Sequence, residues 1–343
     1  MLIIDKKAID VRSEHEFNKG TIPNSISMPI LNDDQHKLVG IEYKKNGKES
    51  AINLGLKLVS GEKRQKLIDE WISIIKEHNV EYIFCKRGGL RSKTAKKWLR
   101  GKDIDIKVLK GGYKSYRKTV VKAHQNLAEY KGNWFIVAGF TGSGKTTIIQ
   151  DLNSSIDLEN LAKHRGSTFG ALNEAQPSQQ NFENKLTYLY QKKCGGNIIL
   201  EAESRNIGSV ALPGKFYEKM RISKYIFVQA DIETRVNNIA NEYITKPLKE
   251  GISKSSLLSA YQKALGKINN RLGANNYVTI NNEMKEAFGN QKGSHKLWIR
   301  LLLENYYDKL YKHKLDEVSK QIIFISDWSS CKNFLDSIDK PVF

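Results

Sequence analysis

The segment from Gly139 to Thr146, Gly-Phe-Thr-Gly-Ser-Gly-Lys-Thr, matches the pattern G-x-x-x-x-G-K-T and directly follows the apolar segment Trp134 to Ala138. In this pattern, glycines let backbone amides converge on two adjacent phosphates, the lysine neutralises them and the threonine binds Mg²⁺. The sequence therefore predicts a strand, a P-loop and a helix within an α/β domain. The candidate diphosphate ligands are Gly139, Gly142, Ser143, Gly144, Lys145 and Thr146, with Mg²⁺ bound through Thr146.

A second loop, Cys85 to Ser92, follows the apolar run Tyr82 to Phe84 and precedes a segment with helical periodicity. Its two glycines allow the amides to converge on the sulfur, and a helix N-terminus placed there lowers the pKa of a thiol. A lone cysteine at a strand end is more often a small buried hydrophobe. The glycines and arginines favour a reactive thiolate, so Cys85, Arg87 and Arg91 are the candidate catalytic residues.

The net charge of +19 is concentrated near this cysteine loop. Between Lys86 and Lys118 the chain has thirteen Lys or Arg and two Asp, and this local excess of positive charge, 13 − 2 = +11, is more than half of the net charge. A solvated basic surface is the simplest explanation. Because the run starts at the cysteine loop, it also suits a polyanionic substrate such as nucleic acid, with Lys114 and Arg117 as candidate contacts.

The 343 residues are sufficient for two ordinary cores, and we expect domains at 1–122 and 132–343. Strand-like and helix-like segments alternate in both, which predicts two α/β domains with largely parallel sheets. The predicted strands are 8–11, 82–84, 134–138, 197–200 and 225–229, and the predicted helices are 63–77 and 92–100. The segment 121–131 is expected to be helical or a tight connection. The part from about 240 onward, including the polar stretch 246–276, is much less diagnostic.

Three cysteines without metal-ligand spacing argue against a disulfide framework, and Cys194 and Cys331 lie outside any motif. No apolar segment approaches the roughly 18 residues of a membrane span, and no signal-peptide pattern is visible at the N-terminus. We expect a soluble cytoplasmic protein with free thiols and no need to be more than a monomer.

Acidic and basic residues accompany the P-loop. The predicted strand 197–200 leads into Glu201 and Glu203, carboxylates placed where they can reach a metal through water. Arg205 is a candidate for stabilising a transition state, whereas His164 and Arg165 are candidates for phosphate or nucleic-acid contacts. Structural roles are the alternative for all of them. No guanine-specifying N-K-x-D follows, so a GTPase is disfavoured.

Two stretches of the first half resemble rhodanese domains: Asp10 to Pro29 resembles their N-terminal signature, and Lys110 to Tyr113 resembles their end. The resemblance implies structural roles for Asp10 and Arg12 beneath the cysteine loop. The loop is one residue longer than the common sulfurtransferase form and fits C-x5-R. Such a loop has room for a tetrahedral, phosphate-bearing donor.

The fused order, together with the blocks 157–167, 176–183 and 201–208, resembles the tRNA 2-selenouridine synthase family, a rhodanese domain joined to a P-loop domain. The resemblance covers about 9–213. It implies a tRNA with 2-thiouridine at the wobble position, S-geranylation by geranyl diphosphate, and replacement of the geranylated sulfur by selenium from selenophosphate. It also implies that Cys85 carries selenium, that the P-loop binds the prenyl diphosphate, and that a selenophosphate-producing enzyme is a transient partner. No tightly bound cofactor is expected.

Three other functions remain open from the residues. One is a nucleotide-dependent kinase with a regulatory rhodanese module, although the intact cysteine loop argues against an inactive module. Another is an RNA-binding protein that uses both loops only to bind anions. The third, a C-x5-R phosphatase, lacks an evident general-acid aspartate nearby.

Overall fold

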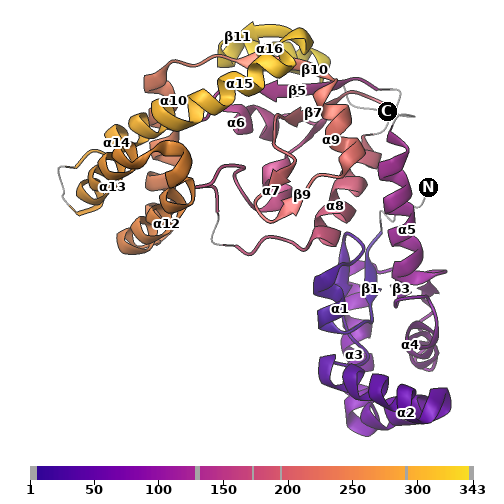
Figure 1. Cartoon of the computed structure of the whole chain (residues 1–343). Helices are drawn as coiled ribbons and strands as arrows, with labels where there is room; N and C mark the ends of the chain where they lie inside the picture. The colour runs from indigo at the N-terminus through magenta and orange to yellow at the C-terminus, as the bar shows by residue number, and fades with distance from the viewer. Residues whose placement is uncertain (1–5, 128–131, 172–173, 194, 290–292, 340–343) are drawn as a thin grey trace. The chain divides into compact units, whose positions relative to one another are not determined.

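The computed structural model describes residues 6–127, 132–171, 174–193, 195–289 and 293–339. The chain forms two compact units (Figure 1): 1–126 with 177–192, and 127–176 with 193–343. The predicted second domain, 132–343, therefore differs from the observed unit, because 177–192 belongs to the first one. Cys194 and the linker residues 128–131 lie outside the described residues.

The first unit is built on a parallel sheet with strand order β2-β1-β3-β4. Its elements are β1 (Ala8–Asp10), α1 (Glu14–Lys19), β2 (Ser25–Ser27), α2 (Asp33–Leu58), α3 (Gly61–His78), β3 (Tyr82–Phe84), α4 (Leu90–Arg100), β4 (Lys107–Val108), α5 (Gly112–Gln125) and α8 (Gln179–Lys192). The predicted strands at 8–11 and 82–84 and the helices at 63–77 and 92–100 are confirmed within one or two residues. The segment 121–125 completes α5, as expected.

Side chains alternate between the two faces of this sheet, as the period of a strand requires. Ile9 and Ile83 belong to a core with Trp71 of α3 and Leu99 of α4. Phe84, on the other face, packs in a second cluster with α5. Both faces are therefore covered, which is the normal condition of a parallel sheet.

Helix α8 contributes polar side chains to the first unit. The amide of Asn184 donates to the carbonyl oxygen of Thr21 over 2.7 Å and to the hydroxyl of Tyr113 over 3.1 Å. The buried hydroxyl of Thr187 lies 2.6 Å from Nε2 of His124. These contacts explain why a segment that follows the P-loop in sequence packs with the N-terminal sheet.

The second unit has a parallel five-stranded sheet of order β11-β10-β5-β7-β6. Its elements are β5 (Trp134–Ala138), α6 (Lys145–Gln150), β6 (Ser155–Ile156), α7 (Leu158–Ala162), β7 (Ile198–Glu201), β8 (Asn206–Ile207), β9 (Val210–Ala211), α9 (Gly214–Arg221), β10 (Lys224–Val228), α10 (Ile232–Ala240), η2 (Asn241–Thr245), α11 (Lys246–Lys249), α12 (Lys254–Leu272), α13 (Ala274–Gly289), α14 (His295–Leu302), η3 (Leu303–Tyr307), α15 (Asp308–Val318), η4 (Ser319–Gln321), β11 (Ile322–Ser326) and α16 (Trp328–Ile338). The three predicted strands of this half are confirmed, and two α/β halves with parallel sheets are as expected.

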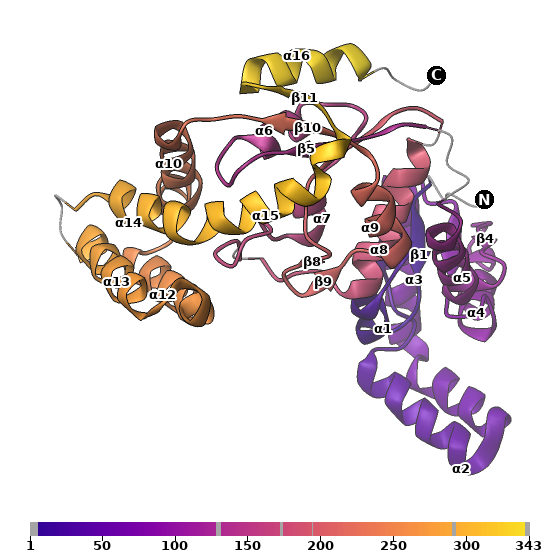
Figure 2. The same cartoon turned by 45° about the horizontal axis from the view of Figure 1, so that its top comes forward.

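Helices cover both faces of this sheet. On one face Phe135 and Val137 of β5 pack with Ile148 of α6 and Leu335 of α16. Figures 1 and 2 both show α16 lying along β10 and β11. On the other face the rings of Trp134 and Phe216 of α9 are 4.7 Å apart. The central strand β5 is thereby buried along its whole length.

The polar stretch 246–276 is helical, and an apolar stripe explains why. In α12 the buried residues Leu257, Tyr261, Leu265 and Ile268 recur at helical spacing. They pack with α13 and α14, which lie beside α12 in Figure 1. Sparse apolar residues on one face are thus enough to build a helical subdomain from a polar sequence.

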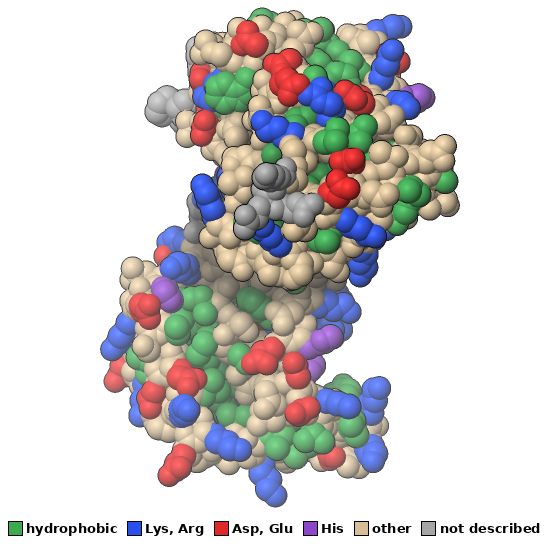
Figure 3. Space-filling view, turned by 90° about the vertical axis from the view of Figure 1, so that its left-hand side faces the viewer, with side chains coloured by type: hydrophobic (Ala, Val, Ile, Leu, Met, Phe, Trp, Pro, Cys, Tyr) green, Lys and Arg blue, Asp and Glu red, His purple; other side chains and the backbone are tan. Residues whose placement is uncertain are grey.

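No helix within the described residues is long and apolar enough to cross a membrane. On the face drawn in Figure 3, lysine and arginine side chains are spread among acidic ones instead of gathering in one patch.

The first unit depends on a backbone contact that only glycine permits. Gly112 has φ +55°, and a Cβ there would lie 2.1 Å from the carbonyl oxygen of Cys85. We expect Gly112→Ala to destabilise the protein by about 2 kcal/mol or more, because backbone atoms must move. Gly40→Ala in helix α2 is the control, since its Cβ meets nothing within 4 Å and alanine favours helix by up to about 1 kcal/mol. Thermal unfolding measures both variants; an equal loss in the two would contradict the prediction.

Candidate functional site

The first site is the cysteine loop between β3 and α4. Cys85 is buried, and its Sγ lies 3.3 Å from the hydroxyl of Ser92 in the first turn of α4. Burial raises the pKa of this thiol, but hydrogen bonds from the Ser92 hydroxyl and the amides of Ser92, Arg87 and Gly89 outweigh it, so the pKa is lowered. This direction agrees with the predicted convergence of loop amides on the sulfur.

The two arginines of this loop differ in their surroundings. Arg87 is exposed at the rim. Arg91 donates to both carboxylate oxygens of Glu16, over 2.5 and 3.1 Å, and Glu16 also closes the capping box of α1. The predicted phosphate-holding role of Arg91 would require it to exchange Glu16 for the ligand, whereas the Arg87 side chain faces solvent without such a rearrangement.

Backbone hydrogen bonds from α5 hold the loop from below. The amides of Tyr113 and Lys114 donate to the carbonyl oxygens of Cys85 and Lys86 over 3.0 and 2.8 Å. The side chain of Lys114 is exposed next to the loop, which suits the predicted anion contact. Arg117 instead pairs with Glu183 and donates to Asn184, so its observed contacts are structural.

Asp10 and Arg12 form a buried pair at the end of strand β1, next to β3 and the start of the cysteine loop. The guanidinium of Arg12 contacts both carboxylate oxygens of Asp10, donates to the carbonyl oxygen of Gly20 and lies 4.1 Å from the ring centroid of Tyr113. Neither residue faces solvent, which agrees with the structural role implied by the rhodanese resemblance.

The second site is the P-loop between β5 and α6, where the predicted phosphate ligands lie together. Gly142 and Gly144 have φ +86° and +85°, and a Cβ at Gly142 would lie 2.7 Å from the carbonyl oxygen of Arg235. Lys145 donates to the carbonyl oxygens of Gly139 and Phe140 over 2.9 and 3.3 Å. The ammonium thus closes the loop on itself, and a bound phosphate would replace these carbonyls.

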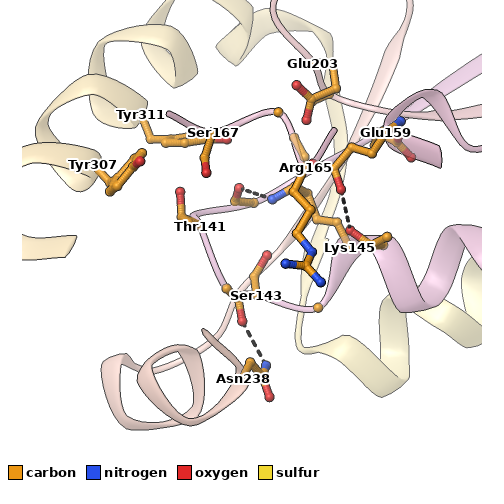
Figure 4. Close-up of a pocket in the computed structure, with 18 of the residues that line it drawn as sticks. Thr141, Ser143, Lys145, Glu159, Arg165, Ser167, Glu203, Asn238, Tyr307 and Tyr311 are labelled. Carbon is orange, nitrogen blue, oxygen red and sulfur yellow. Dashed lines mark hydrogen bonds between the residues drawn. The ribbon is translucent and has the colours of Figure 1, made fainter. Parts of the chain in front are cut away.

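Three residues that the sequence analysis missed brace this loop. Arg235 of α10 is buried, donates to the carbonyl oxygen of Thr141 over 2.9 Å and pairs with Asp308. Asn238 donates to the carbonyl oxygen of Gly142 over 2.8 Å, as Figure 4 shows, and the indole of Trp328 donates to that of Gly144 over 3.1 Å. A lone Arg, Asn or Trp far along the chain carries no motif, so no sequence signal identified them.

Carboxylates line the other side of the loop. In the register of β5 with β7, Val137 lies opposite Glu201, whose Oε1 accepts from the amide of Glu159 over 2.7 Å. Glu159 in turn accepts from the hydroxyl of Thr146 over 3.3 Å. Burial and then Glu203 raise the pKa of Glu159 to about 8, and burial raises that of Glu201 well above its usual range. Glu159 was not among the residues singled out from the sequence.

The P-loop and the carboxylates beside it line one cavity of about 1420 Å³ in the second unit. Arg165 lines it, lying 4.9 Å from the ring centroid of Tyr243, and Figure 4 shows its guanidinium extending toward the P-loop. Glu203 and His164 also line the cavity. Arg205 is exposed and is not among the lining residues, whereas Arg165 is one of them.

The residues around Thr146 fit a Mg²⁺ ion that is completed by ligand phosphates and water. Within the described parts of the chain no three His, Cys, Asp or Glu side chains cluster as an all-protein metal site. Mg²⁺ commonly takes only one or two protein ligands beside phosphate oxygens. Glu201 Oε2 is buried and has no hydrogen-bond partner among the described residues, so a carboxylate oxygen next to Glu159 is left for a cation.

A thiolate loop in one α/β unit and a P-loop in the next define a rhodanese-like domain fused to a P-loop domain. Residues 2–119 match the rhodanese-like domain family, and residues 132–340 match the tRNA 2-selenouridine synthase AAA domain. The chain belongs to the tRNA 2-selenouridine synthase family and is an enzyme, as the sequence resemblance predicted.

Curated relatives cover almost the entire chain. The tRNA 2-selenouridine synthase of Shewanella frigidimarina is 35% identical over 98% of this chain and 96% of its own length. That of Shewanella piezotolerans has the same identity and coverage. The tRNA 2-selenouridine synthase of Nitrosomonas europaea is 35% identical over 91% of this chain and 89% of its own.

The lowered pKa of Cys85 is testable through alkylation. Ser92→Ala removes a hydrogen bond to the thiolate, so the pKa rises and iodoacetamide modification at neutral pH slows by about tenfold, since bonds to charged acceptors are worth about 1.5–3 kcal/mol. The rate is measured against pH by mass spectrometry, with Cys85→Ser supplying the background from the other thiols. An unchanged pH profile in Ser92→Ala would show that the hydroxyl does not stabilise the thiolate.

Proposed function

We propose that the chain converts 2-thiouridine at the wobble position of tRNA into 2-selenouridine, acting in the cytoplasm. The P-loop domain transfers a geranyl group from geranyl diphosphate to the sulfur, and the Cys85 loop then delivers selenium from selenophosphate. Membership of the synthase family supports the outcome. The observation that carries the two-step route is the P-loop cavity, which joins a phosphate end to an aromatic wall.

The phosphate end of the cavity suits a leaving diphosphate. The amides of the loop and Lys145 stabilise negative charge that grows as the carbon–oxygen bond breaks. Mg²⁺, held through Thr146 with Glu159 and Glu201 near it, would supply further charge neutralisation. Asp157, Glu159, Glu201 and Glu203 line the same cavity as Lys145 and Arg165, and a divalent cation would balance these carboxylates beside a bound diphosphate.

The opposite wall suits a hydrocarbon chain. Tyr306, Tyr307, Leu310 and Tyr311 line the cavity from η3 and α15. Tyr311 packs at 6.3 Å, centroid to centroid, against Phe140 of the P-loop, and the ammonium of Lys145 lies 5.7 Å from its ring centroid. A ligand with a charged head and an apolar chain would satisfy both walls at once.

Alkylation prepares the sulfur to leave. The sulfur bound to C2 of the uridine is a poor leaving group, whereas the geranylated sulfur can leave as a thiol. In the second step the exposed side chains of Lys86, Arg87 and Lys114 attract selenophosphate, and the Cys85 thiolate attacks its phosphorus. An S–P bond forms, the P–Se bond breaks, and the released hydrogen selenide replaces the geranylated sulfur, which leaves as geranyl thiol. Water then hydrolyses the S–P bond to phosphate and regenerates the thiol, so the exchange needs no oxidant. A selenophosphate-producing enzyme would supply the donor, and one chain contains both sites.

Nucleoside mass spectrometry tests the division of labour. Purified protein, 2-thiouridine tRNA and geranyl diphosphate, with or without selenophosphate, should yield the geranylated and then the selenated nucleoside. Lys145→Ala should lower geranylation by about 100-fold or more, as expected for loss of charge stabilisation. Cys85→Ser should accumulate the geranylated nucleoside without selenation.

Matched controls are Lys215→Ala, at an exposed lysine of α9, and Cys331→Ala, at a thiol of the sheet core. Both should behave like the wild type. Unchanged nucleosides together with ATP hydrolysis that needs no tRNA would reject the synthase function and favour a nucleotide-dependent kinase.

The aromatic wall makes a separate prediction. Tyr311→Ala should raise the KM for geranyl diphosphate by about tenfold or more, because burial of an aromatic side chain's apolar surface is lost. The affinity of Tyr311→Ala for inorganic diphosphate should stay within about twofold of the wild-type value, which would also show that the P-loop is intact. Tyr43→Ala, at an exposed tyrosine of α2, is the control. Parallel weakening of both ligands in Tyr311→Ala would mean that the ring supports the loop and not the chain.

A further inference from the structure

The turn from Lys163 to Thr168 separates two cavities in the second unit. On one side is the P-loop cavity, and on the other is a cavity of about 570 Å³, within the size range of small-ligand sites. Four residues line both of them: His164, Gly166, Ser167 and Thr168. A group bound in the second cavity therefore lies next to the ligand of the first.

Hydrogen bonds hold the walls of the second cavity in place. The side chain of Gln176 donates to the carbonyl oxygens of Ala162 and Ile207 over 2.9 and 3.0 Å, and its oxygen accepts from the amide of Ser209 over 2.7 Å. Gly208 has φ +61°, and a Cβ there would lie 2.1 Å from Gln176 Oε1. One glutamine thus ties the end of α7 to the turn between β8 and β9.

The dividing turn is equally constrained. Lys163 has φ +51°, uncommon for a residue other than glycine, and Gly166 has φ +66°. A Cβ at Gly166 would lie 2.5 Å from a carboxylate oxygen of Glu203. The turn is therefore thin at its centre, so that little more than backbone separates the second cavity from the P-loop side.

The side chains of the second cavity suit a nucleotide. Lys267 of α12 is exposed at its rim, and the acid Glu174 is paired with Lys163. Nδ1 of His164 is buried and has no hydrogen-bond partner among the described residues. Burial, followed by the charge of Lys267, lowers the pKa of His164, so the ring is neutral at physiological pH and can accept or donate.

The charges that line the two cavities differ, which bears on where an RNA strand can bind. Eight Asp and Glu side chains line the P-loop cavity beside five Lys and Arg, so an RNA strand approaching through it would meet a surplus of acidic groups. In the second cavity Glu174 is paired with Lys163, which leaves Lys267 as a cation at the rim. Phosphates bind preferentially where cations lie.

We propose that the second cavity receives the nucleotide that accepts the prenyl group, with Lys267 contacting an adjoining phosphate and His164 Nδ1 bonding the nucleoside. This rests on the proposed function and identifies where the RNA enters the P-loop domain. The acceptor sulfur then meets the reacting carbon beside Gly166 and Ser167, where the two cavities adjoin, while the diphosphate stays on the P-loop.

Two measurements on the full-length protein test the proposal. The first is steady-state kinetics of geranylation, which gives separate Michaelis constants for the tRNA substrate and for geranyl diphosphate. The second is fluorescence anisotropy with a labelled anticodon stem-loop RNA that carries 2-thiouridine, at about 50 and 200 mM salt. Lys267→Ala and His164→Ala should raise both the Michaelis constant for the tRNA substrate and the Kd for RNA by about fivefold or more. In Lys267→Ala the Michaelis constant for geranyl diphosphate should stay within about twofold of the wild type.

Lys285→Ala removes the same charge from an exposed position on α13 and should leave both RNA constants unchanged. Lys267→Ala should also flatten the salt dependence by about one phosphate contact, a slope change of about 0.7–0.9. His164→Asn, which keeps a nitrogen near the Nδ1 position, should restore part of the RNA affinity lost in His164→Ala.

Wild-type RNA constants in Lys267→Ala and His164→Ala, or an equal weakening in Lys285→Ala, would overturn the proposal. If wild-type protein forms no geranylated nucleoside, the proposed function fails, but the anisotropy measurement still decides whether the second cavity binds RNA.

Discussion

The parallel pairing of β5 with β7 is the constraint on which the second unit depends. It places Glu201 opposite the last residues before the P-loop and buries its carboxylate almost completely. An isolated buried charge is costly, so it must be neutralised, paired or given to a metal. Glu201 is partly satisfied by the amide of Glu159, and its second oxygen has no hydrogen-bond partner within the described residues. The cavity is therefore suited to a ligand that brings a cation.

In both loops of the chain backbone amides converge on one position, but the charges around the two positions are opposite. At Cys85, amides converge on a sulfur next to exposed cations such as Lys86 and Arg87. At the P-loop, amides converge on a phosphate position that carboxylates surround. A free anion is attracted to the first loop, whereas a diphosphate at the second gains from a divalent cation that screens it. This difference supports separate ligands for the two loops.

Local patterns in the sequence predicted the strands and both loops because each has a short-range physical cause. The apolar run before Gly139 and the glycines with positive φ are examples, and β5 and the P-loop were found where they were expected. Long-range partners were not predictable in this way. Arg91 follows the C-x5-R pattern but pairs with Glu16, and Arg117 pairs with Glu183 of a helix that follows the P-loop in sequence. Arg235, which braces Thr141 from 94 residues away, has no local signature at all.

The different surroundings of His164 and Arg165 were likewise not predictable from local sequence. From the sequence both were equivalent basic residues near a P-loop, but the fold gives them different surroundings. Arg165 reaches into the carboxylate-lined cavity, where a guanidinium offsets acidic charge, and His164 also borders the neighbouring cavity with Lys267. Alternate residues of a tight turn can face opposite sides, and this turn is thin because Gly166 lets Glu203 approach its backbone. Such a partition suits the proposed transfer, because the leaving diphosphate and the acceptor sulfur both engage one carbon while the charges of the diphosphate and of the RNA stay in separate cavities.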